Sequence, residues 1–280
     1  MTAPRLVRFA ASDGLPLAAY DWPGPEGRTP VLCLPGLCRT GMDFATLAAR
    51  NAGIRRVVAL DYAGHGESGR AEDLGRYNPE HALRDAMDAC AALQLHRAAV
   101  VGTSFGGLLS MLIAVMRPAF LRGIVLNDIG PEIEAAGLEA VQGFAGTDPA
   151  PASLEEAITH LQGVVPPLGL DEAGWRRFAG LTYASGEDGR LHPRWDTRLA
   201  EASRAGPPAD LWQVWRGVAD LPVLLLWGEA STILSPATVA RMRREKRGLR
   251  VVSLPGIGHA PPLEDNTAMA AVDGFLDEID

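Results

Sequence analysis

A serine flanked by glycines is the feature of this sequence with the clearest chemical meaning. Ser104 lies in Gly-Thr-Ser-Phe-Gly, after the short apolar run Ala98–Val101 and just before the apolar run Leu108–Met116. These runs predict a strand and a helix, so the serine falls on a sharp turn between them. Such a turn strains the backbone and needs small neighbours, which Gly102 and Gly106 supply. It also places the hydroxyl at a helix N-terminus, where N–H groups stabilise an oxyanion, and therefore predicts a nucleophile.

A histidine near the C-terminal end could activate that serine. His259 lies in Gly-Ile-Gly-His-Ala-Pro, shortly after the apolar run Arg250–Leu254. A glycine-flanked loop at the end of a strand can carry an imidazole over the edge of a sheet, so we expect His259 to be the general base. His65, in Gly-His-Gly, is a weaker alternative on another loop of the same edge.

The apolar runs that must position these residues have the pattern of a parallel sheet. They are short, bounded by Gly, Pro or Asp, and show no alternation, as strands covered on both faces require. The expected strands are Leu6–Ala10, Leu17–Trp22, Val31–Leu34, Arg56–Leu60, Ala98–Val101, Gly123–Leu126, Pro222–Trp227 and Arg250–Leu254. Helices are expected at Phe44–Asn51, Pro79–Leu93, Leu108–Met116 and Asn266–Leu276.

The stretch between residues 131 and 218 has a different character. Gly and Pro clusters interrupt its helical pieces, no strong strand is evident, and it carries four of the six tryptophans. The expected helices are Ile133–Phe144, Leu154–Gln162, Glu172–Leu181 and Ala209–Gly217. We interpret 131–218 as a helical lid on a core of residues 1–130 and 219–280. Trp175 and Trp212 are candidates for contact with a substrate, although such aromatic residues can equally pack one lid helix on another.

Composition limits the possible partners. The net charge of −8 disfavours nucleic acid and anionic membranes, and no apolar helix is long enough to span a bilayer. The three cysteines and a start without a signal peptide's apolar core favour a cytoplasmic protein with reduced thiols. We expect neither metal nor cofactor, because the fingerprint Gly-His-Gly-Glu-Ser-Gly at 64–69 follows the fourth expected strand and opens no helix.

Taken together, these motifs resemble the α/β-hydrolase superfamily over essentially the whole chain. The resemblance rests on the turn at Ser104, the helical insertion and the Gly-Ile-Gly-His before the C-terminus. The chain is most similar to the cap-bearing branch of esterases, lactonases and carbon–carbon hydrolases, including enol-lactonase-like proteins. The resemblance implies an α/β fold with a mostly parallel sheet of eight strands and a lid inserted after the sixth. It also implies the order nucleophile, acid, histidine along the chain.

The acid is where the sequence departs from this family. Relatives usually carry an aspartate a few residues after the seventh strand, whereas Trp227–Pro236 contains none and Thr232 takes that place. Some similar family members carry their acid after the sixth strand instead, so we favour Asp128 as the acid. Asp128 could also only cap the turn that leads into the lid. Glu229, or a triad impaired at Thr232, remains an alternative.

The oxyanion hole needs two backbone donors. The resemblance implies the N–H of Phe105, which follows the nucleophile, and one N–H from the loop after the third strand, for which we choose Leu37. Arg39, close by, could hold a substrate carboxylate or carbonyl, or could only brace the loop. Cys38 lacks the strained turn of a nucleophile.

These observations predict a serine hydrolase that cleaves a small-molecule ester or lactone through an acyl-enzyme. The predicted catalytic residues are Ser104, His259 and Asp128. Two alternatives remain: a carbon–carbon hydrolase of vinylogous diketones, which Arg39 would suit, and a ligand-binding protein with impaired catalysis. The oligomeric state and the natural substrate are left open by the sequence.

Overall fold

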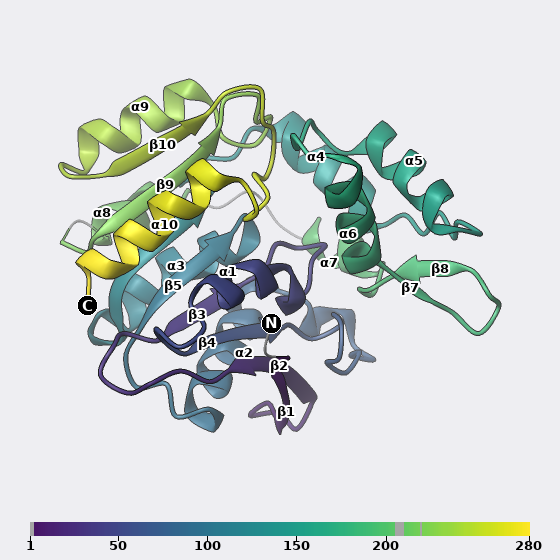
Figure 1. Cartoon of the computed structure of the whole chain (residues 1–280), viewed down its shortest axis with the longest axis horizontal. Helices are drawn as coiled ribbons and strands as arrows, with labels where there is room; N and C mark the ends of the chain where they lie inside the picture. The colour runs from purple at the N-terminus through teal and green to yellow at the C-terminus, as the bar shows by residue number, and fades with distance from the viewer. Residues whose placement is uncertain (1–2, 205–209, 219) are drawn as a thin grey trace.

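An eight-stranded sheet forms the centre of the protein in the computed structural model, which describes residues 3–204, 210–218 and 220–280 (Figure 1). The strand order is β1-β2-β4-β3-β5-β6-β9-β10, and only β2 runs in the direction opposite to the other strands. The strands are β1 (Arg5–Ala10), β2 (Pro16–Trp22), β3 (Val31–Leu34), β4 (Val57–Asp61), β5 (Ala98–Thr103), β6 (Leu121–Asn127), β9 (Val223–Gly228) and β10 (Arg250–Leu254). The predicted α/β fold with a mostly parallel sheet is confirmed.

Helices cover both faces of this sheet, which is why its central strands are apolar without alternation. In β5, Val100 packs in one core cluster, whereas Ala99 and Val101 pack in the cluster on the opposite face. The helices α1 (Ala45–Arg50) and α10 (Asn266–Glu278) cover the face nearer the viewer in Figure 1. The other face carries α2 (Pro79–Ala92), α3 (Phe105–Met116), α8 (Trp212–Gly217) and α9 (Pro236–Glu245). Short 3-10 turns lie at Gly41–Phe44 (η1), Leu74–Arg76 (η2) and Pro118–Phe120 (η3).

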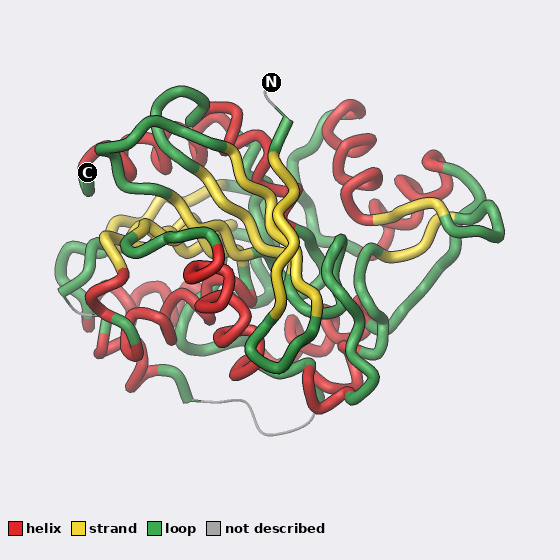
Figure 2. Tube along the Cα trace, turned by 90° about the horizontal axis from the view of Figure 1, so that it is seen from below, coloured by secondary structure: helices red, strands yellow, loops and turns green. Residues whose placement is uncertain are grey.

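Most of the chain between β6 and β9 forms a separate group of elements beyond one edge of the sheet (Figures 1 and 2). This group contains α4 (Ala135–Ala145), α5 (Leu154–Val164), α6 (Glu172–Thr182), β7 (Tyr183–Ser185), β8 (Leu191–Pro193) and α7 (Leu199–Ser203). The pairing of β7 with β8 was not expected, because strands of three residues are too short to show a period.

The last helix of the predicted lid belongs to the core instead. Trp212 and Trp215 of α8 are buried in the core cluster that covers the α3 face of the sheet. The first residue of the helix expected there, Ala209, lies outside the described residues. The predicted range 131–218 therefore includes one helix that packs with the core.

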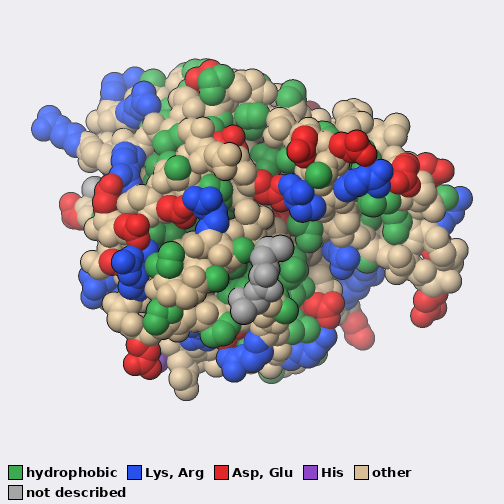
Figure 3. All heavy atoms as spheres, in the orientation of Figure 1, with side chains coloured by type: hydrophobic (Ala, Val, Ile, Leu, Met, Phe, Trp, Pro, Cys, Tyr) green, Lys and Arg blue, Asp and Glu red, His purple; other side chains and the backbone are tan. Residues whose placement is uncertain are grey.

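Acidic and basic side chains are interspersed over the face shown in Figure 3. One exposed ion pair joins the group of elements outside the sheet to the core, from Arg177 of α6 to Glu264 before α10, at 2.5 Å. No helix within the described residues is long and apolar enough to cross a membrane.

The backbone is tightly packed around the two glycines of the turn between β5 and α3. A Cβ on Gly106 would lie 1.9 Å from the backbone oxygen of Leu34, and one on Gly102 would lie 2.5 Å from the backbone of Gly106. Neither clash can be relieved by rotating a side chain, because backbone atoms are involved. Gly106 therefore lets α3 approach strand β3 closely, and Gly102 lets it pack closely on strand β5, because both positions lack a side chain.

We predict that Gly106→Ala destabilises the protein by about 3 kcal/mol, as overpacking against fixed backbone does. A matched control is Gly143→Ala in α4, where a Cβ meets nothing within 4 Å. That substitution replaces a helical glycine and should stabilise the protein by up to about 1 kcal/mol. Urea unfolding followed by circular dichroism measures both changes. Equal stability of the two variants would contradict this account of the turn.

Candidate active site

Ser104 sits between the end of β5 and the first residue of α3, in a strained backbone conformation. Its φ is 50° and its ψ is −113°, in a region that non-glycine residues rarely occupy. The Ser104 N–H donates to Asn127 O at 3.0 Å, and the carbonyl of Ser104 accepts from Gly107 at 2.8 Å. The side chain is therefore held at the edge of the sheet, with its Oγ 2.8 Å from Nε2 of His259.

His259 reaches Ser104 from the loop that follows β10. The loop is held in place by the Asn127 amide, which donates to Pro261 O at 2.9 Å, and by Gly258 N–H, which donates to Pro167 O at 2.6 Å. Only 9% of the His259 side chain is exposed. These contacts fix the imidazole against the sheet edge.

Asp128 follows β6 directly and completes the arrangement. Its φ is 56°, and its N–H donates to Leu226 O of β9 at 2.8 Å. The carboxylate is fully buried, with Oδ2 lying 2.8 Å from His259 Nδ1 and Oδ1 accepting from Gly228 N–H at 2.9 Å. An ionised carboxylate only accepts hydrogen bonds, so Nδ1 carries the imidazole proton and Nε2 is left to accept from the serine hydroxyl.

The other candidate acids lie elsewhere. Thr232 and Glu229 are exposed, and the ring nitrogens of His259 face Ser104 and Asp128. Thr232 lines the cavity beside the serine, whereas Glu229 is not among the cavity's lining residues. The geometry therefore places Asp128, and not Thr232 or Glu229, against the histidine.

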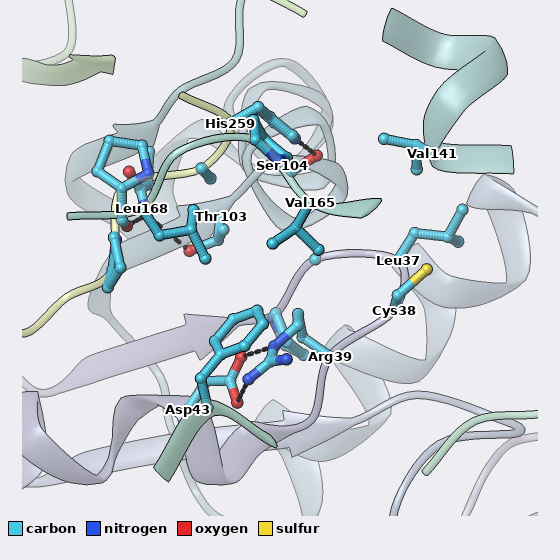
Figure 4. Close-up of a pocket in the computed structure, with 18 of the residues that line it drawn as sticks. Leu37, Cys38, Arg39, Asp43, Thr103, Ser104, Val141, Val165, Leu168 and His259 are labelled. Atoms are coloured by element: carbon cyan, nitrogen blue, oxygen red, sulfur yellow. Dashed lines mark hydrogen bonds and ion pairs between the residues drawn. The ribbon is translucent and has the colours of Figure 1, made fainter. Parts of the chain in front are cut away.

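The loop after β3 is the expected source of one oxyanion donor. Leu37 lies in this loop and lines the same cavity as Ser104 (Figure 4), and Phe105 is the first residue of α3. The first N–H groups of a helix have no acceptor within it, so that of Phe105 can point at a ligand. The distance from either N–H to an oxyanion depends on a bound substrate, so their role stays a prediction.

Two side chains from the loop after β4 hold the loop that carries Leu37. The sequence analysis did not predict this supporting role for either of them. Tyr62 donates its hydroxyl hydrogen to Pro35 O at 3.2 Å and packs its ring edge-on against Phe105, with 5.4 Å between ring centroids. His65, the alternative base, is buried, and its Nε2 lies 2.6 Å from Leu37 O. It therefore supports the loop and does not face the serine.

A cavity of about 200 Å³ opens beside Ser104 and His259 (Figure 4). Its walls come from the loop after β3, from α4 and α6, and from the segment between α5 and α6. Most of them are apolar, including Leu37, Val141, Phe144, Val165, Leu168, Phe178, Leu181 and Leu263. Arg39 and Asp43 add a polar pair to the wall. Cys38 also lines the cavity, and burial raises the pKa of its thiol to about 12.

The two tryptophans predicted to contact substrate are not among the residues that line this cavity. Trp175 packs edge-on against Phe178, with 5.8 Å between ring centroids, and Trp212 donates from Nε1 to Glu132 at 3.0 Å. Their placement corrects that prediction, because both pack within the protein. The aromatic rings that do line the cavity belong to Phe44, Phe144 and Phe178.

The described residues contain no group of three or more His, Cys, Asp or Glu side chains that could hold a metal ion. The chemistry that these residues can perform is proton transfer and nucleophilic attack. A serine hydroxyl, an imidazole and a buried carboxylate lie in one hydrogen-bonded line, an arrangement that can activate a hydroxyl.

Comparison with known proteins shows the family of this chain. The sequence model described as "Alpha/beta hydrolase family" matches residues 31–272. The chain belongs to the alpha/beta hydrolase family. Its members include esterases and other hydrolases, and the fold and the resemblance predicted from the sequence are both confirmed.

Several individual hydrolases align along most of the chain. A 3-hydroxybutyrate-oligomer hydrolase of Cupriavidus necator is 32% identical, with 98% of each chain covered. A 2-(acetamidomethylene)succinate hydrolase of Mesorhizobium japonicum is 27% identical over 88% of this chain and 87% of its own length. The crystal structure of an alpha/beta hydrolase from Novosphingobium aromaticivorans superposes with a TM-score of 0.94 at 37% identity, covering 99% of both chains.

We predict that a fluorophosphonate labels Ser104, and that Asp128→Asn slows this labelling by about 10⁴-fold, as loss of the triad carboxylate does. Intact-protein mass spectrometry over time measures the rate, with Ser104→Ala as the unlabelled control. Thr232→Asp restores the acid at the usual family position and should not increase the rate. If Asp128→Asn labels as fast as the unmodified chain while Thr232→Asp labels faster, Asp128 is not the acid.

Proposed function

We propose that this alpha/beta hydrolase is a serine hydrolase that cleaves carboxylic esters, and that its substrates are short oligoesters of hydroxy acids. The observation that carries the proposal is the continuous line of hydrogen bonds from Asp128 through His259 to Ser104, at 2.8 Å for each step. This line ends at the wall of an apolar cavity large enough for a short chain.

In the first half of the proposed reaction, Nε2 of His259 takes the proton of Ser104 as Oγ attacks the ester carbonyl. The imidazolium that forms is stabilised by the buried Asp128 carboxylate. The tetrahedral intermediate collapses when His259 returns the proton to the leaving alcohol, and the acyl group stays on Ser104 as an ester. In the second half, His259 deprotonates water, which attacks this acyl-enzyme. The bond between the acyl group and Ser104 Oγ then breaks, the acid leaves, and His259 returns the proton to Oγ.

The oxyanion of both tetrahedral intermediates rests on the N–H groups of Leu37 and Phe105. The positive end of the α3 dipole adds to this stabilisation, because Phe105 begins the helix. The apolar cavity walls exclude water from the intermediate, which strengthens these hydrogen bonds. Tyr62 and His65 hold the loop that provides the Leu37 donor.

Support for an oligoester substrate comes from the relative that is aligned over nearly its entire length, the 3-hydroxybutyrate-oligomer hydrolase. Each unit of such an oligomer presents a small apolar backbone and one ester group. An apolar cavity with a few polar groups suits this repeat. A lactone would react through the same steps, since it is a cyclic ester.

A carbon–carbon hydrolase is the second candidate. A 2-hydroxymuconate semialdehyde hydrolase of Pseudomonas putida is 35% identical, but over only 34% of this chain. The case for this activity would rest on Arg39 as a carboxylate anchor, and Arg39 already pairs with Asp43. The contact of Asp128 with His259 argues against a purely ligand-binding role, because that role was suggested by the lack of an aspartate in the Trp227–Pro236 segment.

We also propose that the protein acts on small molecules in the cytoplasm. Cys33, Cys38 and Cys90 are free and buried, which suits a reducing compartment.

We predict that the protein hydrolyses the dimer and trimer of 3-hydroxybutyrate as well as p-nitrophenyl butyrate, and that Ser104→Ala lowers kcat by about 10⁶-fold. Product analysis by liquid chromatography measures hydrolysis of the oligomers, and release of p-nitrophenol measures hydrolysis of the chromogenic ester. A ring-fission diketone is the competing substrate. Faster cleavage of the diketone than of every ester, or full turnover by Ser104→Ala, would contradict the proposal.

A further inference from the structure

A polar cluster in the wall of the active-site cavity takes no part in the proposed hydrolysis steps. Arg39, from the loop after β3, forms a two-pronged ion pair with Asp43 of η1: Nε contacts Oδ2, and Nη2 donates to Oδ1 at 2.9 Å. Both residues line the cavity, and their side chains are only 14% and 23% exposed. The charge of the guanidinium is therefore balanced within the protein before any substrate binds.

The guanidinium of Arg39 is also held from the other side by α6. Its Nη1 donates to Thr182 Oγ1 at 2.5 Å, and this hydroxyl in turn donates to Phe178 O at 2.7 Å. The ring of Phe178 lies against the guanidinium, with 4.1 Å from Cζ to the ring centroid. Contacts from η1 and α6 thus fix the orientation of the Arg39 guanidinium.

The donors of Arg39 are not all used by these contacts. A guanidinium carries five N–H bonds. The contacts with Asp43 and Thr182 use three of them, which leaves one on Nη1 and one on Nη2. Arg39 lines the cavity, so these two N–H bonds remain for a ligand there, while the pair as a whole has no net charge.

The cluster lies within reach of a short substrate chain bound at Ser104. Gly36 lies between them, because a Cβ built on it would be 3.6 Å from Cγ of Arg39 and 3.8 Å from Cβ of Ser104. Figure 4 shows the Arg39–Asp43 pair and the Ser104–His259 pair on opposite sides of Val165. A group a few bonds away from the reacting ester can therefore meet the guanidinium.

We propose that Arg39, with Asp43 and Thr182, forms a charge-neutral subsite that binds an uncharged acceptor of the substrate, the carbonyl oxygen of a second ester, and disfavours a carboxylate. This inference rests on the proposed ester hydrolysis. A carboxylate there would lose its hydration to apolar walls and would be repelled by Asp43, whereas an ester carbonyl loses little hydration and gains a charge-assisted hydrogen bond. The subsite thus selects the interior of an oligoester over its acidic end.

The test compares substrates that differ only at the far end of the chain. One series consists of p-nitrophenyl esters whose acyl chain ends in a methyl ester, a carboxylate or an alkyl group of equal length. A second series carries the same three ends on the alcohol side of a butyrate ester. In the series whose end reaches Arg39, we expect kcat/KM for the methyl ester to exceed that for the carboxylate by about tenfold.

Two substitutions should change this ratio in opposite directions. Asp43→Asn leaves the Arg39 charge unbalanced, so it should raise the carboxylate-to-methyl-ester ratio of kcat/KM by about tenfold. Arg39→Gln leaves Asp43 as an uncompensated anion, so it should lower this ratio further and remove the preference for methyl ester over alkyl. A purely structural role for the pair would change all three substrates alike.

The matched control is Asp273→Asn, which makes the same change in net charge at an ion pair with Arg50 outside the cavity. It should leave the ratio unchanged. The inference is overturned if the unmodified enzyme prefers the carboxylate in either series, or if Asp43→Asn leaves the ratio as it was in both. Failure of the unmodified enzyme to turn over any ester overturns the proposed function, and the subsite with it.

Discussion

The hydrogen bond between Asp128 and His259 is the contact on which the rest of the site depends. A fully buried carboxylate must have its charge matched by donors, and here the donors are Gly228 N–H and His259 Nδ1. Satisfying Asp128 therefore fixes the tautomer of the imidazole, and the tautomer in turn makes Nε2 an acceptor for Ser104. In the proposed reaction, the activation of Ser104 therefore depends on how a buried anion is accommodated.

Strand order brings these groups together. Ser104 follows β5 and Asp128 follows β6, which are neighbouring parallel strands, and the His259 loop follows β10. Parallel strands end at one edge, so residues far apart in sequence meet there. The chain that continues from Asp128 forms α4 to α7, whose helices α4 and α6 help to wall the cavity. Asp128 and part of the cavity wall thus come from one segment of the chain. Arg39 connects this wall to the loop that carries Leu37 through its hydrogen bond to Thr182 of α6.

The fold and the approach of His259 to Ser104 could be predicted because they leave short-range marks: unbroken apolar runs for buried strands, and glycines around Ser104. The choice between Asp128 and Thr232 could not be settled from the sequence, since it depends on a backbone turn with φ of 56° and on the pairing of β6 with β9. The side chains that line the cavity were harder still to predict. Trp175 and Phe178 lie one turn apart on α6, and only the packing of that helix decides that Phe178 lines the cavity.

Proton NMR of the resting protein tests the central claim most directly. The histidines are labelled with ¹⁵N, and the variant His259→Gln identifies the signal of His259 among the six. In the neutral form of His259, we expect the ring proton on Nδ1. We also expect a far-downfield Nδ1 proton, shifted by the bond to Asp128 and lost in Asp128→Asn. A neutral His259 protonated on Nε2, or a downfield proton that survives in Asp128→Asn, would contradict this claim.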